Sequence, residues 1–553
     1  MSSGPTPWSR GEQIAAGLIF ALALALRLLH LREIGLHDPF FELPMTDARL
    51  YHQWAIEIAG GQWLGEGVFV LAPLYAYFLG LLYAVFGAEV EIAMIANSLL
   101  GALSCVLLVA VGRRYFDRRA ALIASALIAV DSTSIFFGGM LAAANLVVPL
   151  VLLLVLAAQR AHESPSALRW FIAGLVLGLG TLAWQTLLLF APYLVAWPIF
   201  SENSRALQRA RWATLALAGM VVVVLPVSVR NYAVADQLAL VNTGGGISFY
   251  AGNHPHANGT YGIPRRYARV IAAEPVERRQ LFAEVATQVS GRELEPSEIS
   301  GFWARETFEY ISSNPGQWLR HEARKFGLFW NAAELWSDRS PTAERVFSWV
   351  RGLPLVSFAV VGPLALLGMA LRLRELHRLY LLYAVLEFHL LASLVFSVLA
   401  RDRLSALPAL YLFASAAACW LWDQGRRRRF RALAMGTIGL GFAAWLVHLP
   451  LSRENLAMAD YRLGDRFAQA EEWDAAIEYF GRSLNRDPGA VSTWSNLALA
   501  FEARGDRDRD ALHTWLRVLD LARRKEFHLH TERAEQHLRD LGHEPLIAPP
   551  GAH

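Results

Sequence analysis

Asp47 is the side chain whose type and place in the sequence are best suited to chemistry. It stands in PMTDARLYHQWA (44–55), soon after the first apolar stretch of the chain. A carboxylate near the bilayer surface can accept a proton from a hydroxyl, or hold a divalent metal ion that activates the hydroxyl indirectly. At helical spacing Tyr51 and Trp54 share its face, and His52 lies beside them, so Tyr51 and His52 are candidates for binding the substrate or the donor phosphate. The alternative is that Asp47 caps the helix beginning there, and one residue could do both.

Three arginines are candidates for stabilising a phosphate. Arg401 and Arg403 stand in RDRLSALPAL between two apolar stretches, and Arg230 stands at the end of another stretch. Arginine suits this role because its planar guanidinium can donate two parallel hydrogen bonds to phosphate oxygens. The alternative for Arg401 and Arg403 is interfacial anchoring or contact with phospholipid, and snorkelling alone would explain Arg230.

The string GNHPHANG, which begins at Gly252, offers further polar groups. Asn253 and His254 could donate to a phosphate, and His254 with His256 could bind a metal ion. No third ligand at a recognisable spacing supports a zinc site, so solvation of a loop is the alternative for the histidines. The preceding GGG (244–246) lacks the strand–turn–helix context of a nucleotide-binding fingerprint.

Membrane-crossing helices must position these residues. The chain of 553 residues is 55% hydrophobic and only 18% charged, and its apolar residues are clustered in stretches of about 20. Loops rich in arginine are retained on the cytoplasmic side, and five such loops occur at 113–119, 160–169, 205–211, 372–378 and 426–431. Placing all five in the cytoplasm predicts eleven spans, at roughly 12–31, 92–112, 119–137, 141–159, 168–183, 185–201, 210–229, 348–371, 379–399, 405–424 and 431–450.

This count gathers the candidate residues on the extracytoplasmic side. The remaining apolar stretch, 72–87, is barely long enough to cross, and its proline and tyrosines suit a helix lying in the outer interface. Segment 230–347 is long enough for a folded insert rather than a bare loop. The formal charge of +3 is small for this length, so nothing indicates nucleic acid as a partner.

The C-terminal region has a different pattern. The spacing of Leu463, Gly464, Phe467, Ala476, Phe480, Leu484 and Pro488 matches the 34-residue tetratricopeptide pattern, and a second copy begins near Trp494. The expected domains are an N-terminal transmembrane half (1–229), the insert (230–347), C-terminal transmembrane helices (348–450) and tetratricopeptide-like repeats (457–545). We therefore expect an all-α integral membrane protein. The count places the repeats outside, but one miscounted helix would move them to the cytoplasm.

The order of several motifs resembles that in GT-C glycosyltransferases, and more narrowly the branch related to protein O-mannosyltransferases and aminoarabinose lipid A transferases. These motifs are LYHQWA after an acidic residue, APLYAYFLGLLYAVFG, SVRNYAVADQLALVNTGGGISFYAGNHP, NPGQWLRHEARKFGLFW and RDRLSALPAL. The resemblance covers residues 12 to about 450. It implies an inverting transferase of the cytoplasmic membrane that moves a sugar from a polyprenyl-phosphate donor to a protein, glycan or lipid on the outer face. Asp47 matches the first-loop acidic position, which implies a general base or metal-assisted activator.

Three departures from the family pattern leave an alternative open. Ala48 replaces a second acidic residue, Ala144 replaces a common Glu, and Trp184 with Gln185 replaces Arg-Pro. They indicate either an unusual substrate or a catalytically decayed scaffold. In the first case the repeats would position an acceptor partner, and in the second they would serve assembly. A transporter is the third hypothesis, with Asp131 and Glu387 as the main acids in the spans.

Overall fold

The computed structural model of the chain divides into two compact units. The residues it describes are 7–38, 40–44, 46–200, 205–260, 275–336, 339–452, 455–505, 508–525 and 527–543. Unit 1 contains Met1–Ile34, Leu43–Asp338 and Ser348–Ser452, and unit 2 contains Gly35–Glu42, Arg339–Phe347 and Arg453–His553. Unit 2 therefore combines the C-terminal region with two short segments from much earlier in the sequence.

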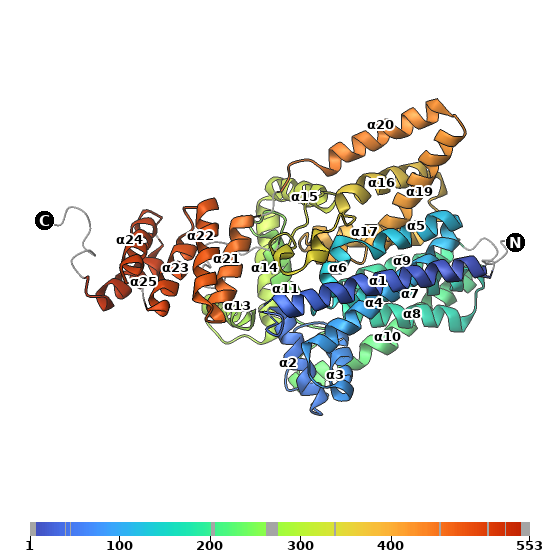
Figure 1. The fold of residues 1–553 in the computed structure, drawn as a ribbon. Coiled ribbons are helices and arrows are strands. Elements are labelled where there is room, and N and C mark those ends of the chain that lie inside the picture. Colours follow the sequence, from blue (N-terminus) through green and yellow to red (C-terminus); the bar gives the residue numbers. More distant parts are fainter. Residues whose placement is uncertain are drawn as a thin grey trace. The chain divides into compact units, whose positions relative to one another are not determined.

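Unit 1 contains a bundle of apolar helices (Figure 1). Among the described residues, five helices are long and apolar enough to cross a membrane: α1 (Arg10–His37, whose last turn extends into unit 2), α4 (Val90–Tyr115), α7 (Ala144–Glu163), α10 (Ala206–Ala235) and α20 (Phe430–Val447). Packed among them are α8 (Ala167–Ala183), α16 (Phe358–Leu371), α17 (Tyr380–Val395) and the largely buried α19 (Leu407–Arg426). The described residues form no β-strand. The prediction of an all-helical, multi-pass membrane protein is confirmed.

The predicted spans coincide with helical segments, but not all are continuous helices. The predicted span 119–137 is divided into α5 (Arg118–Ala129) and α6 (Ser132–Gly138). The division arises because the Asp131 carboxylate caps α6 by accepting from the Ser134 amide at 2.6 Å, while the Ser132 amide donates to the Val356 carbonyl at 2.8 Å. The span 185–201 is likewise irregular, with η1 (Gln185–Phe190), α9 (Ala191–Ala196) and η2 (Trp197–Phe200), because Pro192 and Pro198 lack an amide hydrogen.

Two short helices follow the first span. They are α2 (Asp47–Ala59) and α3 (Leu74–Phe86), which pack against each other so closely that a Cβ on Gly80 would overlap the Ile58 side chain. With 13 residues α3 is roughly 20 Å long, which is shorter than the hydrocarbon core of about 30 Å. Its length agrees with the predicted interfacial helix.

Between α10 and α16 the chain forms a small helical insert. Its described helices are α11 (Gly245–Asn253), α13 (Pro275–Ser290), α14 (Pro296–Ser313) and α15 (Pro315–Phe329). Tyr250, Phe282, Phe302 and Trp303 form a shared apolar core between α11, α13 and α14. Residues 261–274 of the predicted insert lie outside the described residues. The insert boundaries at 230 and 347 stay predictions.

Unit 2 contains successive helices that pack in sequence order, together with the two earlier segments. Its helices are α21 (Leu456–Gln469), α22 (Trp473–Arg486), α23 (Val491–Arg504), α24 (Asp508–Arg524) and α25 (His528–Asp540), and each packs on the next. The helices α21 and α23 begin 35 residues apart, as do α22 and α24. The pairing is compatible with helical repeats, and their identity as tetratricopeptide repeats stays a prediction.

Candidate active site

Asp47 and Arg401 form an ion pair. Arg401 Nη1 donates to Asp47 Oδ2 at 3.0 Å, across a sequence separation of 354 residues. The side chains of Asp47 and Arg401 are 37% and 28% exposed, so a solute can approach both. The start of α2 and the short helix α18 (Ala400–Arg403) thus bring a carboxylate and a guanidinium together at the protein surface.

The capping alternative for Asp47 is wrong in the structure. The helix α2 begins at Asp47 itself, and the N-cap residue is Thr46, which makes no side-chain capping bond. Thr46 has a φ of 56°, in the left-handed region that a β-branched residue rarely adopts. A carboxylate in the first turn is favoured by the helix dipole, and the Asp47 carboxylate binds Arg401 rather than an amide of its own helix.

Tyr51 and His52 hold α2 against its neighbour. The Tyr51 hydroxyl donates to the Ala72 carbonyl at 3.3 Å, and its ring meets the Tyr75 ring edge-on at 5.1 Å. His52 Nδ1 lies 2.8 Å from the Tyr83 hydroxyl. These contacts hold the helix that carries Asp47 against α3, and binding of substrate or donor phosphate by Tyr51 and His52 stays a prediction.

Arg403 is buried, in contrast to Arg401. Its Nη1 donates to the carbonyls of Phe329 and Asn331 at 3.0 Å each, and its guanidinium lies 3.8 Å from the centre of the Phe358 ring. Burial lowers the pKa of Arg403 to about 10, although the carboxylates of Glu334 and Asp131 oppose the shift. Arg403 therefore anchors α18 to the chain that follows α15, and Arg401 is the arginine of the two that reaches the surface.

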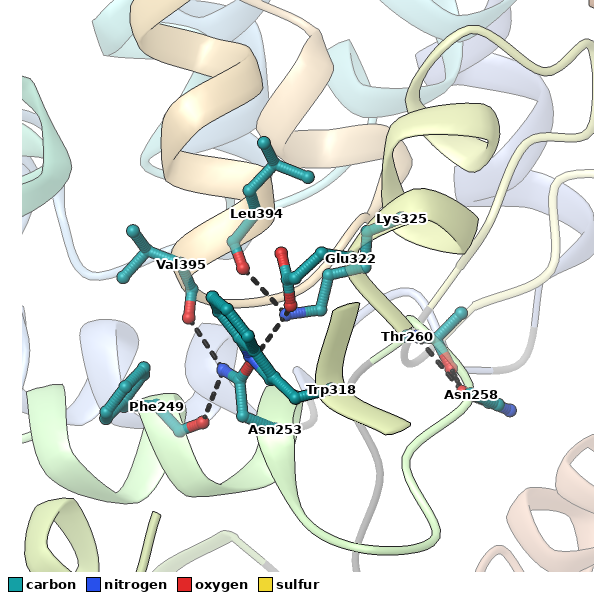
Figure 2. Close-up of polar contacts among 9 residues, drawn as sticks. All are labelled: Phe249, Asn253, Asn258, Thr260, Trp318, Glu322, Lys325, Leu394 and Val395. Carbon is teal, nitrogen blue, oxygen red and sulfur yellow. Dashed lines mark hydrogen bonds and ion pairs between the residues drawn. The ribbon is translucent and has the colours of Figure 1, made fainter. Parts of the chain in front are cut away.

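Asn253 is also buried, at the end of α11. Its Nδ2 donates to the carbonyls of Phe249 at 2.9 Å and Val395 at 2.8 Å (Figure 2). Its Oδ1 accepts from Lys325 Nζ at 2.8 Å and from Trp318 Nε1 at 3.3 Å. Every hydrogen-bonding atom of this amide is thus engaged by protein, which assigns Asn253 to the scaffold.

Lys325 completes the same cluster. Its Nζ donates to the Leu394 carbonyl at 2.7 Å and is paired with Glu322 at 3.0 Å (Figure 2). The last carbonyls of a helix have no partner within the helix, so Lys325 and Asn253 together cap the C-terminus of α17. Burial lowers the pKa of Lys325 and raises the pKa of Glu322, and each shift is opposed by the charge of the other residue.

The capped end of α17 leads directly to α18. After α17 the Val398 amide donates to the Gly259 carbonyl at 2.9 Å, and the Ala400 amide donates to the Leu335 carbonyl at 2.7 Å. These bonds fix the backbone immediately before Arg401. The Lys325 cluster is therefore part of the framework that holds Arg401 at Asp47.

Replacing Lys325 with Met should destabilise unit 1 by about 3 kcal/mol, because Glu322 would lose its partner and the Leu394 carbonyl its donor. The double variant Lys325→Met/Glu322→Gln should be more stable than the single variant Lys325→Met, since it leaves no unpaired buried carboxylate. Thermal unfolding in detergent measures both. Arg320→Gln, an exposed change on the same helix, is the control. Equal unfolding temperatures for Lys325→Met and the control would contradict this role.

Arg230 and His254 both contact other parts of the protein. Arg230 donates to the carbonyls of Leu64 and Gly67, at 2.7 Å and 2.6 Å, and its guanidinium lies over the Phe69 ring. His254 is buried, and its Nδ1 accepts from the His256 amide at 3.2 Å. Arg230 thus holds the loop before α3, and these contacts leave phosphate binding by either residue as a prediction.

Asp402 is a neighbour of the pair that sequence reasoning missed. Its Oδ1 lies 3.8 Å from Arg401 Nε, so carboxylates flank the guanidinium on two sides. Burial raises the pKa of Asp402 to about 6, Arg401 opposes the shift and the charge of Asp47 adds to it. The signal in the sequence was an acid between two arginines in RDR, but the motif did not reveal that Asp47 lies on the other side of Arg401.

The acids considered for a transporter differ in their surroundings. Asp131 is buried and accepts from the Tyr411 hydroxyl at 2.6 Å, and nearby Thr133 donates to Glu334. Glu387, by contrast, is exposed on α17. Helix capping and packing contacts account for the buried Asp131 without transport.

The described residues bring no three His, Cys, Asp or Glu side chains together in a way that could hold a metal ion. Asp47 has a guanidinium on one carboxylate oxygen instead of a second ligand residue. Binding of a divalent metal by Asp47 therefore remains a prediction.

The sequence of one segment matches a known family. Residues 71–229 match the family described as dolichyl-phosphate-mannose-protein mannosyltransferase, and the resemblance to GT-C glycosyltransferases is confirmed over this segment. The match begins just before α3 and ends at the residue before Arg230. No curated protein matches the chain.

Two solved structures illustrate what the whole chain is similar to. The archaeal oligosaccharyltransferase AglB from Archaeoglobus fulgidus, in complex with an inhibitory peptide and a dolichol-phosphate, is 15% identical with a TM-score of 0.44, over 84% of this chain and 59% of that chain. ArnT from Cupriavidus metallidurans, bound to undecaprenyl phosphate, is 15% identical with a TM-score of 0.33, over 75% of this chain and 79% of that chain. The chain thus spans about three fifths of the archaeal enzyme.

Proposed function

We propose that this protein is a membrane glycosyltransferase. The premise is that residues 71–229 match the dolichyl-phosphate-mannose-protein mannosyltransferase family. The protein transfers a sugar from a polyprenyl-phosphate donor to an extracytoplasmic acceptor, with inversion at the anomeric carbon. The observation that carries the proposal is the half-exposed Asp47–Arg401 pair. It supplies a proton acceptor and a phosphate-binding cation side by side.

In the proposed reaction Asp47 is the general base. Its carboxylate accepts the proton of the acceptor hydroxyl as the hydroxyl oxygen attacks the anomeric carbon. The bond between that carbon and the donor phosphate breaks, and the electron pair leaves with the lipid phosphate. Arg401 is placed to stabilise the negative charge that develops on this leaving group.

The surrounding helices suit a lipid donor. The helix α3 exposes Leu81, Val85 and Phe86, which give the polyprenyl chain an apolar surface at the membrane interface. We assign the protein to the cytoplasmic membrane with the pair on the extracytoplasmic face. The helical repeats of unit 2 would bind an acceptor or a protein partner.

The experiment that tests this function measures release of polyprenyl phosphate from a polyprenyl-phosphate-linked mannose by the purified protein in lipid nanodiscs. Membrane extract that contains an acceptor is added, and labelled sugar is followed into the acceptor fraction. Empty nanodiscs are the control. The alternative, a catalytically decayed scaffold, predicts donor turnover no faster than in the control, whichever lipid-linked sugar is supplied.

The rate of transfer should depend on Asp402. As the pH rises through about 6, the Asp402 carboxyl group loses its proton. Its negative charge then competes with Asp47 for Arg401 and raises the proton affinity of Asp47, which makes Asp47 a stronger base. We therefore expect kcat/KM to rise through this pH and the Asp402→Asn variant to lose that rise. A pH profile measured between 5 and 8 checks the prediction, and an identical profile for both proteins would contradict it.

Asp402 should also make the free energy of unfolding depend on pH. Because the pKa of Asp402 is higher in the folded protein than the ordinary aspartate value, proton binding contributes stability at acidic pH. This contribution is lost as the pH rises through about 6. Asp402→Asn should thus narrow the difference in unfolding temperature between pH 5 and pH 7.5.

A further inference from the structure

The turn between α19 and α20 in unit 1 concentrates positive charge. Helix α19 ends at Arg426 and α20 begins at Phe430, so the two helices form a hairpin, with α20 at the edge of the bundle (Figure 1). Five of the six residues from 426 to 431 are arginines, and all five are exposed. We call this set the arginine turn, and its members are Arg426, Arg427, Arg428, Arg429 and Arg431.

The backbone of the arginine turn has a defined conformation that does not favour arginine. The Arg428 amide donates to the Gly425 carbonyl at 3.1 Å, and the Arg429 amide donates to the Gln424 carbonyl at 3.0 Å. Arg428 itself has a φ of 53°. This is the Schellman motif, in which the left-handed residue is usually glycine because a Cβ is unfavourable there. The backbone therefore does not explain why an arginine stands at position 428.

The charge of the arginine turn is not balanced by the protein. Just after α16, for comparison, Arg372 lies 2.6 Å from Glu375. Across the part of the chain that the structure describes, none of the five arginines of the turn forms an ion pair. The acid nearest to them in the sequence, Asp423, is engaged by Arg119 of α5, whose Nη2 lies 2.9 Å from its Oδ2. The positive charge is thus left for a ligand to balance.

Exposed apolar side chains border the arginine turn on both helices. They are Trp422 on α19 and Phe430, Met435 and Ile438 on α20. Helix α20 is apolar enough to cross a membrane and packs on α16 and α19, so its exposed side chains face lipid. Aromatic residues at the end of such a helix lie at the level of the lipid headgroups. The arginines between Trp422 and Phe430 therefore lie at the level of the lipid phosphates.

We propose that the arginine turn is a binding site for the headgroups of anionic phospholipids. A phosphodiester has a negative charge and oxygens that can accept the parallel hydrogen bonds of a guanidinium. Trp422 and Phe430 favour a lipid over a soluble anion, because their rings are placed to contact the acyl chains below the same headgroups. The ligand is a lipid of the bilayer and not the sugar donor, so the proposal does not rest on the proposed function.

A lipid titration tests the proposal. Phosphatidylglycerol is added to the full-length protein in a neutral detergent, and bound lipid is counted by native mass spectrometry. A fourfold variant carries the changes Arg426→Gln, Arg427→Gln, Arg429→Gln and Arg431→Gln. Its affinity for phosphatidylglycerol should be about 10²- to 10³-fold weaker than that of the unaltered protein.

The matched control removes the same charge from exposed arginines outside the turn. Its changes are Arg292→Gln, Arg320→Gln, Arg517→Gln and Arg524→Gln. The control should bind phosphatidylglycerol almost as tightly as the unaltered protein. Equal affinities for the fourfold variant and the control would overturn the proposal.

Arg428→Gly separates the charge from the backbone conformation. Glycine is favoured at a φ of 53°, so the unfolding temperature of this variant in neutral detergent should be at least that of the unaltered protein. Its affinity for phosphatidylglycerol should still fall about fivefold, because one guanidinium is lost. An unchanged affinity in this folded variant would contradict lipid binding by Arg428.

Two competitors distinguish a lipid headgroup from other ligands. Phosphatidylcholine should bind much more weakly than phosphatidylglycerol, because its choline cation neutralises the phosphate. Inorganic phosphate at the same concentration should not displace phosphatidylglycerol, because it lacks the acyl chains. Displacement by inorganic phosphate would indicate a site for a soluble anion, and equal binding of the two lipids would indicate unspecific lipid contact. Either result would overturn the proposal.

Discussion

Replacing Asp47 with Asn should lower sugar transfer by about 10²- to 10⁴-fold. Asparagine keeps the size of the side chain but cannot accept the hydroxyl proton, and its neutral amide weakens the contact with Arg401. The loss should appear in kcat, because the donor lipid still has its binding surface. Initial rates of polyprenyl phosphate release at saturating donor measure it.

Asp236→Asn is a matched control for this change. Asp236 is exposed at the end of α10 and has a φ of 51°, a conformation that asparagine tolerates well. The variant should fold and transfer normally. Comparable rates for the two variants would remove Asp47 from the mechanism.

Arg401→Gln should lower kcat by about 10²- to 10³-fold, because the leaving phosphate loses its guanidinium. Arg401→Lys should recover part of this loss, since it restores the charge but not the planar pair of donors. The combined Asp47→Asn/Arg401→Gln variant should be little worse than the slower single variant, because the two residues act as a unit. Single-turnover rates with a labelled donor separate the chemical step from donor binding.

Arg292→Gln serves as the control for Arg401. Arg292 forms an exposed ion pair with Glu298 at 2.6 Å in the insert, so the variant removes a surface arginine pair without touching the site. A rate for Arg401→Gln that equals the rate for Arg292→Gln would leave Arg401 without a role in phosphate stabilisation.

The sequence was sufficient to predict most helices of unit 1, because stretches of about 20 apolar residues have few other stable forms in a membrane protein. It could not predict the break at Asp131. That break depends on Val356, a residue more than 200 positions away whose carbonyl accepts from the Ser132 amide. The local sequence around Asp131 contains no information about a partner so distant in the chain.

The candidate site was predictable in part, for a related reason. Residue type and loop position singled out Asp47 and Arg401, which the structure joins. The same criteria also selected Arg403, Arg230 and Asn253, whose polar atoms are engaged by backbone carbonyls or neighbouring side chains. Whether an arginine faces solvent or serves the scaffold is decided by tertiary packing. Asp402 was missed because its effect on the site depends on Asp47, which lies on the other side of Arg401 but is distant in the sequence.

The assembly of unit 2 from distant segments constrains how the protein is made, since its Asp38 and Arg466 side chains lie 3.5 Å apart. During translation Asp38 leaves the ribosome more than 400 residues before Arg466, which corresponds to roughly 20 to 90 s of synthesis. Throughout that interval the segment Gly35–Glu42 has no C-terminal helices to bind. A nascent chain therefore completes unit 2 only after its last helices have emerged, and a prematurely terminated chain would present the otherwise buried Asp38 and Phe40 to chaperones and proteases.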